Sequence, residues 1–271
     1  MGDGLDEIVS FKKPPVVEVV CGAQFHILPL QTVHFGQFGQ RVGTYRQTLD
    51  SPPIAPAVEA QPGSPQIFFQ SFAIGPGLPE LRRVFFIDDE RGRLIQLQTN
   101  RFHHNWQHRP ALGSYPRFPG VRSEFLARWD DFTDFLAGVA LPPPNITQYE
   151  MMYVNHMPAG HLWESPEDVS KIFPWLTSQH TALAGPSEVE VALHYELPEC
   201  RGRLHVGIKT GTRQTDNVRV VQMELLVRGA PTVERAPSEM SDWLATARSA
   251  IVRTFAELTG PTAHVHWERE K

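Results

Sequence analysis

The tetrapeptide Arg-Gly-Arg-Leu occurs twice in the chain, at residues 91–94 and 201–204. Each copy falls at a turn between two strand-like runs, and each precedes a long stretch with helical periodicity. Both parts of the chain therefore follow the same order of strand, short helix, several strands and long helix. We expect an internal duplication in which residues 1–141 and 145–271 each form an α+β half. A chance match at a common hairpin turn is the alternative.

Each half contains one amphipathic helix with an apolar stripe to bury. The first follows Ser123, a predicted N-cap, and ends before the proline run at 142–144, where we place the boundary between the halves. The second begins near Ser238 and ends at Gly260. The simplest packing lays each helix across an antiparallel sheet, and two halves side by side form a continuous, saddle-like sheet with helices on one side. The other side is then the candidate binding surface.

Strand-like runs fill most of the remaining chain. Residues 93–106 alternate apolar and polar side chains and predict one long, half-buried strand. Residues 32–49 predict a short helix, residues 165–173 a second one, and the proline-rich residues 50–65 an extended surface loop. In the run 188–197 every second residue from Val189 to Leu197, Tyr195 included, is expected on the core face. The other predicted strands are residues 16–27, 66–73, 82–87, 146–157, 203–212, 218–228 and 264–268.

Composition narrows the class of protein. The chain is 41% hydrophobic and 20% charged, and its longest apolar run is shorter than the roughly 20 residues that span a bilayer. A net charge of -5 gives no basic surface for nucleic acid. The N-terminus carries no signal-peptide pattern, and two widely separated cysteines fit a reducing compartment. We therefore expect a cytoplasmic protein without a membrane or nucleic-acid partner.

Motifs for known chemistry do not occur. The sequence holds no G-x-S-x-G, S-x-x-K, P-loop or G-x-G-x-x-G pattern in a suitable context, so we predict no catalytic residue and no cofactor. Twelve histidines raise the question of a metal. Consecutive His103 and His104 point to opposite faces of a strand, and His108 lies too far along to join either. The pairs His156 with His161 and His264 with His266 are weak candidates, and we predict no metal site.

Three short motifs resemble a sporadically distributed bacterial family of uncharacterised proteins of similar length. They are PPVVEVV at residues 14–20, IQLQTNRFHHNW at 95–106 with a Tyr-Pro after it, and YVNH at 153–156. The family has no established activity. His103 and His104 depart from its pattern, which weakens a metal site built on them. The resemblance implies that the family pattern includes Glu18, Gln98, Arg101, Asn105, Trp106, Asn155 and His156.

These residues are the predicted ligand-binding or partner-binding set. Gln98, Arg101, Asn105 and Trp106 together offer amides, a guanidinium and an indole, which suit carboxylate or peptide recognition. The same groups are equally able to form a hydrogen-bonded seam that locks the two halves together. Glu18 interrupts an apolar strand, and we expect it to face solvent at a sheet edge because an unpaired buried charge is costly.

Three functions are compatible with these observations. The first is a non-catalytic cytoplasmic adaptor that binds another protein through its sheet face and the proline-rich loop. The second is a small-molecule-binding protein or an enzyme with a pocket between helix and sheet, in which His156 and Glu18 act as acid and base. The third, a saddle that holds nucleic acid, is disfavoured by the acidic balance.

Overall fold

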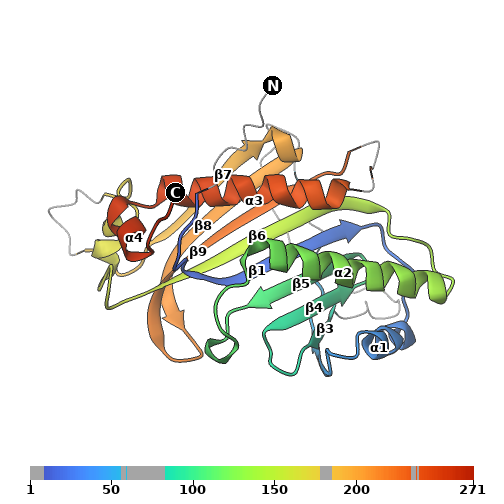
Figure 1. The fold of residues 1–271 in the computed structure, drawn as a ribbon. Helices are drawn as coiled ribbons and strands as arrows, with labels where there is room; N and C mark the ends of the chain where they lie inside the picture. Colours follow the sequence, from blue (N-terminus) through green and yellow to red (C-terminus); the bar gives the residue numbers. More distant parts are fainter. Residues whose placement is uncertain (1–8, 56–58, 60–82, 178–184, 233–235, 237) are drawn as a thin grey trace, which may run out of the picture.

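The computed structural model describes residues 9–55, 59, 83–177, 185–232, 236 and 238–271. The fold is α+β, with one nine-stranded antiparallel sheet and helices packed on it (Figure 1). The strands are β1 (Val16–Phe25), β2 (Gln47–Ser51), β3 (Arg83–Ile87), β4 (Arg93–Gln98), β5 (Arg101–Gln107), β6 (Ile146–Pro158), β7 (Glu190–Leu197), β8 (Gly202–Arg213) and β9 (Val218–Gly229). The helices are α1 (Thr32–Arg41), α2 (Arg117–Gly138), α3 (Glu239–Leu258) and α4 (Pro261–His266), with short 3₁₀ turns η1 (Pro110–Leu112), η2 (Pro166–Lys171) and η3 (Pro198–Cys200).

The strand order is β2-β3-β4-β5-β1-β6-β9-β8-β7. Strands β1 and β6 pair antiparallel near the centre, so the strands of residues 1–141 lie to one side of this pair and those of residues 145–271 to the other. Because β1 is bonded to β5 on one flank and to β6 on the other, its backbone polar groups are paired on both edges. Residues from either part of the chain thereby meet across β1.

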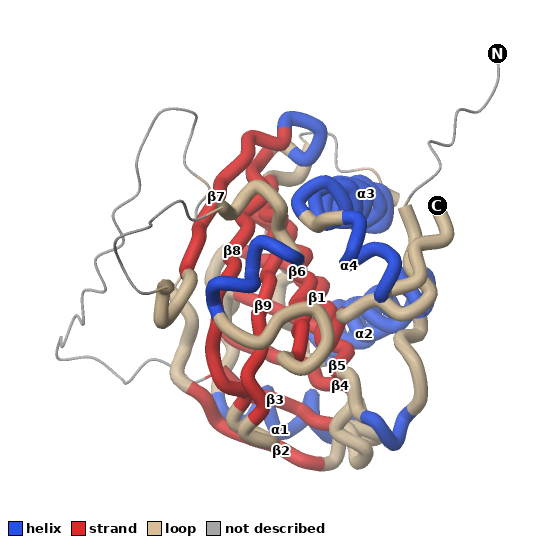
Figure 2. Tube along the Cα trace, turned by 90° about the vertical axis from the view of Figure 1, so that its left-hand side faces the viewer, coloured by secondary structure: helices blue, strands red, loops and turns tan. Residues whose placement is uncertain are grey.

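Helices α2 and α3 lie on the same face of the sheet, as the side view in Figure 2 shows. Helix α3 buries the stripe expected from its sequence, including Trp243, Leu244 and Ile251, and begins and ends where the sequence predicts. Helix α2 buries Phe125 and Phe132, but it begins at Arg117, so Ser123 lies inside the helix and is not its N-cap. The ring of Phe132 stacks on Phe102 of β5 with the centroids 5.1 Å apart.

Residues 93–106 do not form one strand. They fold into the hairpin β4–β5, in which Gln98 pairs with Arg101 and Leu94 with Asn105. The turn at Thr99 and Asn100 contains no glycine or proline, so the usual turn signal is missing from the sequence. Tertiary contacts fix this turn instead, because Thr99 O accepts from Leu28 N at 2.8 Å and Asn100 O accepts from Phe25 N at 3.0 Å.

Other predicted elements also change. Residues 264–268, expected as a strand, belong largely to α4, for which Pro261 supplies the first turn. The predicted helix of 32–49 ends at Arg41, and β2 follows it into the start of the proline-rich segment. Strand β7 stands last in the sheet order, so its expected core face is partly covered and Tyr195 remains 41% exposed. The predicted strand 66–73 lies outside the described residues. The cap of Ser165 and Asp168 forms as predicted and opens η2.

The face of the sheet turned away from α2 and α3 carries an unusual number of polar side chains, and we call it the polar face. Strand alternation places them there, because every second residue of a strand points the same way. Several are nevertheless less than 9% exposed, including Gln24, Arg101, His103 and Glu150. Buried polar groups need hydrogen-bond partners, so this face is the candidate location of a functional site.

Candidate functional site

The structure divides the predicted site residues between the two faces of the sheet. Gln98, Arg101 and Asn105 lie on the polar face with Glu18 and His156. Trp106 lies on the helix face, where its ring centroid is 5.0 Å from that of Tyr115. Asn155 also faces the helices and donates to the carbonyl of Met223 at 3.3 Å. The expected set of guanidinium, amides and indole is therefore not assembled, since the indole is on the other side.

A cavity of about 370 Å³ lies on the polar face. Side chains from β1, β3, β4, β5, β6 and β9 line it, together with Ile54 from the segment after β2. Its apolar lining includes Leu94, Met152 and Leu226, while its polar groups fall into two clusters. One cluster is centred on Glu150 and the other on Glu18.

Glu150 of β6 is the centre of the charged cluster. Its Oε2 atom is 2.8 Å from Nε2 of His103, and its Oε1 atom is 3.7 Å from Arg101 and 3.5 Å from Arg228. The Glu150 and Arg101 side chains are only 5% and 3% exposed, so this is a buried ion network. Burial favours the protonated acid, but the hydrogen bond with His103 and the arginine charges outweigh it and lower the pKa of Glu150 to about 2. Burial lowers the pKa of His103, and the hydrogen bond and negative charge of Glu150 oppose that shift.

Three arginines that line the cavity leave a hydrogen-bond donor unused. The Nε atoms of Arg83, Arg101 and Arg228 are out of contact with solvent and have no acceptor in hydrogen-bonding geometry within the described part of the chain. Nη2 of Arg101 donates to Gln24 Oε1 at 2.6 Å. Desolvation lowers the pKa of Arg83, and the nearby charge of Arg101 lowers it further. All three side chains line the same cavity.

The second cluster is a chain of side-chain hydrogen bonds across four strands. Arg83 Nη1 donates to Gln96 Oε1 at 2.9 Å, and Gln96 Nε2 donates to Asn105 Oδ1 at 2.8 Å. Glu18 Oε1 then accepts from Asn105 Nδ2 at 2.6 Å and from Gln107 Nε2 at 3.0 Å. Glu18 is thus half-buried and partnered near the middle of the sheet, and the expectation of a solvent-facing residue at an edge is wrong because β1 is a central strand.

The start of the proline-rich segment crosses the polar face. Ile54 exchanges two hydrogen bonds with the side chain of Gln98, at 2.8 and 2.9 Å, and Ala55 O lies 3.4 Å from Arg101 Nη2. Glu59 reaches β8, where its Oε1 atom is 2.8 Å from His205 Nε2. Gln98 therefore anchors this segment, and the remainder of the predicted loop, residues 56–58 and 60–65, lies outside the described residues.

His156 and Glu18 do not form a pocket between helix and sheet, because both project from the polar face. His156 donates through Nε2 to Gln222 Oε1 at 3.2 Å, and desolvation lowers its pKa. His104 points to the helix face, where its Nε2 atom is 3.0 Å from the Tyr45 hydroxyl and burial lowers its pKa to about 3. These contacts fit structural roles for His156 and His104.

No cluster of three or more His, Cys, Asp or Glu side chains suited to a metal ion is present among the described residues. His264 sits on a helix and is bonded to Thr259 at 2.8 Å, so His264 and His266 do not share a strand face. An unpredicted pair does meet, because Nδ1 of His194 lies 2.8 Å from Nδ1 of His205.

Sequence reasoning missed Glu150, Arg83 and Arg228, which organise the cavity, and considered His103 only as a metal ligand. A charged residue within an apolar strand, such as Glu150, indicates a functional or paired group. It does not indicate which residue is its hydrogen-bond partner. The partners are decided by register, which places Gly22 between Glu150 and His103. Because glycine has no side chain, the acid and the imidazole meet across β1.

The fold is an antiparallel sheet with helices packed on one face. The polar cavity lies on the opposite face. No family model matches the chain, and no curated protein does. Among the described residues, no helix is both long and apolar enough to cross a membrane.

Proposed function

We propose that this protein is a non-catalytic cytoplasmic binding protein that recognises an acidic segment of another protein through the polar face. The observation that carries the proposal is the set of buried Nε donors of Arg83, Arg101 and Arg228, which line one cavity without a hydrogen bond in the described residues, although Arg228 Nε lies 3.5 Å from Glu150. Leaving such a donor unsatisfied costs about 1–3 kcal/mol. A carboxylate in the cavity would accept from these donors and offset the repulsion between the guanidinium groups.

Arg83 is the most available of the three. Arg101 and Arg228 share Glu150, whereas no carboxylate lies within ion-pair distance of Arg83 in the described part of the structure. Its guanidinium carbon lies 4.7 Å from the ring centroid of Phe85, which holds the planar group in place. An arginine fixed in this way loses little side-chain entropy when it binds a carboxylate.

The chain of amides favours a peptide over a compact anion. Gln96, Asn105 and Gln107 present amide groups beside the Glu18 carboxylate, and such groups pair with the N–H and C=O groups of a polypeptide. On the β1–β5 pair, Glu18 stands opposite Gln107, and Gln24 stands opposite Arg101. Glu18 and Gln24 are six residues apart on β1, so the two clusters are separated along the strand. A ligand that reaches both clusters is therefore extended.

The internal duplication remains part of this proposal. The sheet order supports it, because the central pair β1 and β6 is flanked on both sides by strands and each half contributes one long helix to the same face. In this interpretation the two halves form a continuous saddle-like sheet, and the polar face spans both. The resemblance to the sporadic bacterial family belongs to the same proposal.

A displayed library of random peptides tests the function. The purified protein is expected to enrich peptides that contain Asp or Glu, and Arg83→Gln is expected to bind a selected peptide about tenfold more weakly or worse. Arg213→Gln is the matched control, because Arg213 lies away from the cavity and pairs with Asp216 at the surface. Enrichment without acidic residues, or equal affinity of wild type and Arg83→Gln, would overturn the proposal. Binding of free small carboxylates but of no peptide would contradict the protein partner.

A further inference from the structure

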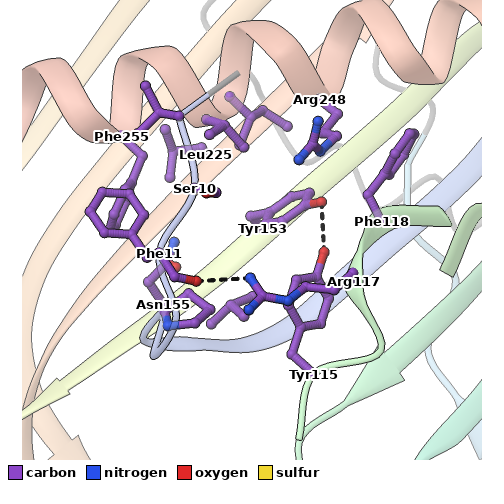
Figure 3. Close-up of a pocket in the computed structure, with 15 residues that line it drawn as sticks. Ser10, Phe11, Tyr115, Arg117, Phe118, Tyr153, Asn155, Leu225, Arg248 and Phe255 are labelled. Atoms are coloured by element: carbon purple, nitrogen blue, oxygen red, sulfur yellow. Dashed lines mark hydrogen bonds between the residues drawn. The ribbon is translucent and has the colours of Figure 1, made fainter. Parts of the chain in front are cut away.

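A second cavity, of about 80 Å³, lies on the helix face and is separate from the polar face (Figure 3). Helix α3, strand β6, the start of α2 and the N-terminal residues from Val9 to Pro14 enclose it. Its interior is apolar, with walls that include Phe11, Val16, Leu225, Ile251 and Phe255. Two tyrosines and Arg248 form one polar end, and the exposed Arg117, which donates to the carbonyl of Phe11, also lines the cavity.

The polar end carries positive charge and hydroxyl groups. The hydroxyls of Tyr115 and Tyr153 are 2.9 Å apart, and Arg248 extends from α3 toward the hydroxyl end of Tyr153 (Figure 3). Arg117 donates through Nη1 to the carbonyl of Phe11 at 2.8 Å. Neither Arg117 nor Arg248 has a carboxylate within ion-pair distance in the described residues, so this end has an excess of positive charge.

Two features hold these groups at the pocket. The Arg248 guanidinium lies over the ring of Phe118, with 5.3 Å between its carbon and the centroid. Arg117 adopts a left-handed backbone conformation, φ 63°, at the first residue of α2, which is unusual for a residue other than glycine.

Burial raises the pKa of Tyr115 to about 12, so its hydroxyl stays protonated and able to donate. Ser10 also lines the pocket, but its hydroxyl donates to Glu270.

We propose that this pocket binds a short-chain aliphatic carboxylate, with the alkyl chain in the apolar interior and the carboxylate beside Arg248, Arg117 and the tyrosine hydroxyls. The size sets the chain length, because a cavity of about 150 Å³ accepts benzene and this one is smaller. Charge selects the acid over the neutral compound, since arginine–carboxylate hydrogen bonds are among the stronger ones in proteins. The site is independent of the proposed peptide site on the polar face.

Titration of the full chain with butyrate and isovalerate, followed by ligand-observed NMR, tests the proposal. Saturable binding of the acids is expected, with the matched neutral amides binding about tenfold more weakly or worse. Arg248→Gln should lower the affinity by a similar factor, and Arg248→Lys should lose less because the charge remains. Arg83→Gln on the polar face should leave acid binding unchanged, which separates this site from the peptide site.

A pocket-filling variant provides a second measurement that keeps both arginines. Val252 lines the cavity from α3, and Val252→Phe is expected to abolish binding of the acids while the far-UV circular dichroism stays that of wild type. Equal affinity for acid and amide, wild-type affinity of Arg248→Gln, or unchanged binding by Val252→Phe would each overturn the proposal. So would the absence of saturable binding by any acid from propionate to valerate.

Discussion

Glu150 shows how one side chain can decide the character of a whole surface. Its carboxylate is shared by His103, by Arg101, which has no other carboxylate within ion-pair distance among the described residues, and by Arg228, which also approaches Glu59. Replacing the whole ion network by apolar side chains of similar size would change the stability little, because desolvation of the charges offsets their attraction. Removing only the acid leaves the buried Arg101 without an ion pair and leaves Arg228 with Glu59 alone, at 3.9 Å.

We predict that Glu150→Gln destabilises the protein by about 3–5 kcal/mol at pH 7, measured by urea unfolding. The half-buried Glu18 provides the matched control, since its oxygen accepts from two amides and from no arginine. Glu18→Gln should cost about 1 kcal/mol. Equal losses in the two variants would show that the charge of Glu150 is not what holds Arg101 and Arg228.

The low pKa of Glu150 also predicts how the stability of the protein changes at acidic pH. Because its folded-state pKa is about 2 and its ordinary value is 4.5, its contribution is complete above pH 4.5 and is lost as the pH falls toward 2. The contribution is worth about 3 kcal/mol by linkage. Wild type should therefore lose more stability than Glu150→Gln between pH 5 and pH 2, and the two urea-unfolding curves should converge at the acid end. Parallel curves for the two proteins would contradict an ionised Glu150.

At the scale of elements, β1 is the strand on which the site depends, because His103 packs over its glycine. A Cβ atom at Gly22 would lie 2.0 Å from His103 Cδ2 and 2.7 Å from the carbonyl oxygen of Phe102. The backbone oxygen cannot move without disturbing the β1–β5 ladder. Gly207 of β8 has open space at the corresponding position.

Gly22→Ala is accordingly expected to destabilise the protein by about 1–3 kcal/mol, whereas Gly207→Ala should be near neutral or slightly stabilising. Thermal unfolding of the two variants measures the difference. The imidazole signals of His103 in NMR should shift in Gly22→Ala alone. A neutral Gly22→Ala would mean that β1 and β5 can separate without cost.

At the scale of the molecule, the pairing of β1 with β6 makes the two halves interdependent. Cutting the chain in the exposed proline linker at 142–144 leaves every described strand intact but separates this central pair. Each fragment alone would expose a strand edge and part of its apolar core. We predict that fragments 1–142 and 143–271 aggregate or stay largely unfolded when expressed separately, and co-purify as a folded complex when expressed together.

Circular dichroism and gel filtration of the separate and combined fragments measure this outcome. Monomeric, cooperatively folding fragments would instead show two autonomous domains. In that case the proposed duplication would be of independent units, and a cavity lined by residues from both halves would be the product of their docking.

The sequence determined those elements whose signals are local. The stripe of α3 ends at Gly260, and the Ser165–Asp168 cap opens η2, because periodicity and capping depend on residues a few positions apart. It also marked Glu18 as unusual, since a charge within an apolar strand stands out from its neighbours, whereas Arg101 and Asn105 were named through the resemblance to the bacterial family.

Only the tertiary structure decided how those groups combine. The Thr99–Asn100 turn accepts hydrogen bonds from the backbone of Phe25 and Leu28, so no local pattern revealed the hairpin that brings Gln98 opposite Arg101. Register across β1 then placed Glu150 beside His103, and strand alternation sent Trp106 to the opposite face. Partnership between strands distant in sequence depends on pairing and register, which are properties of the assembled sheet.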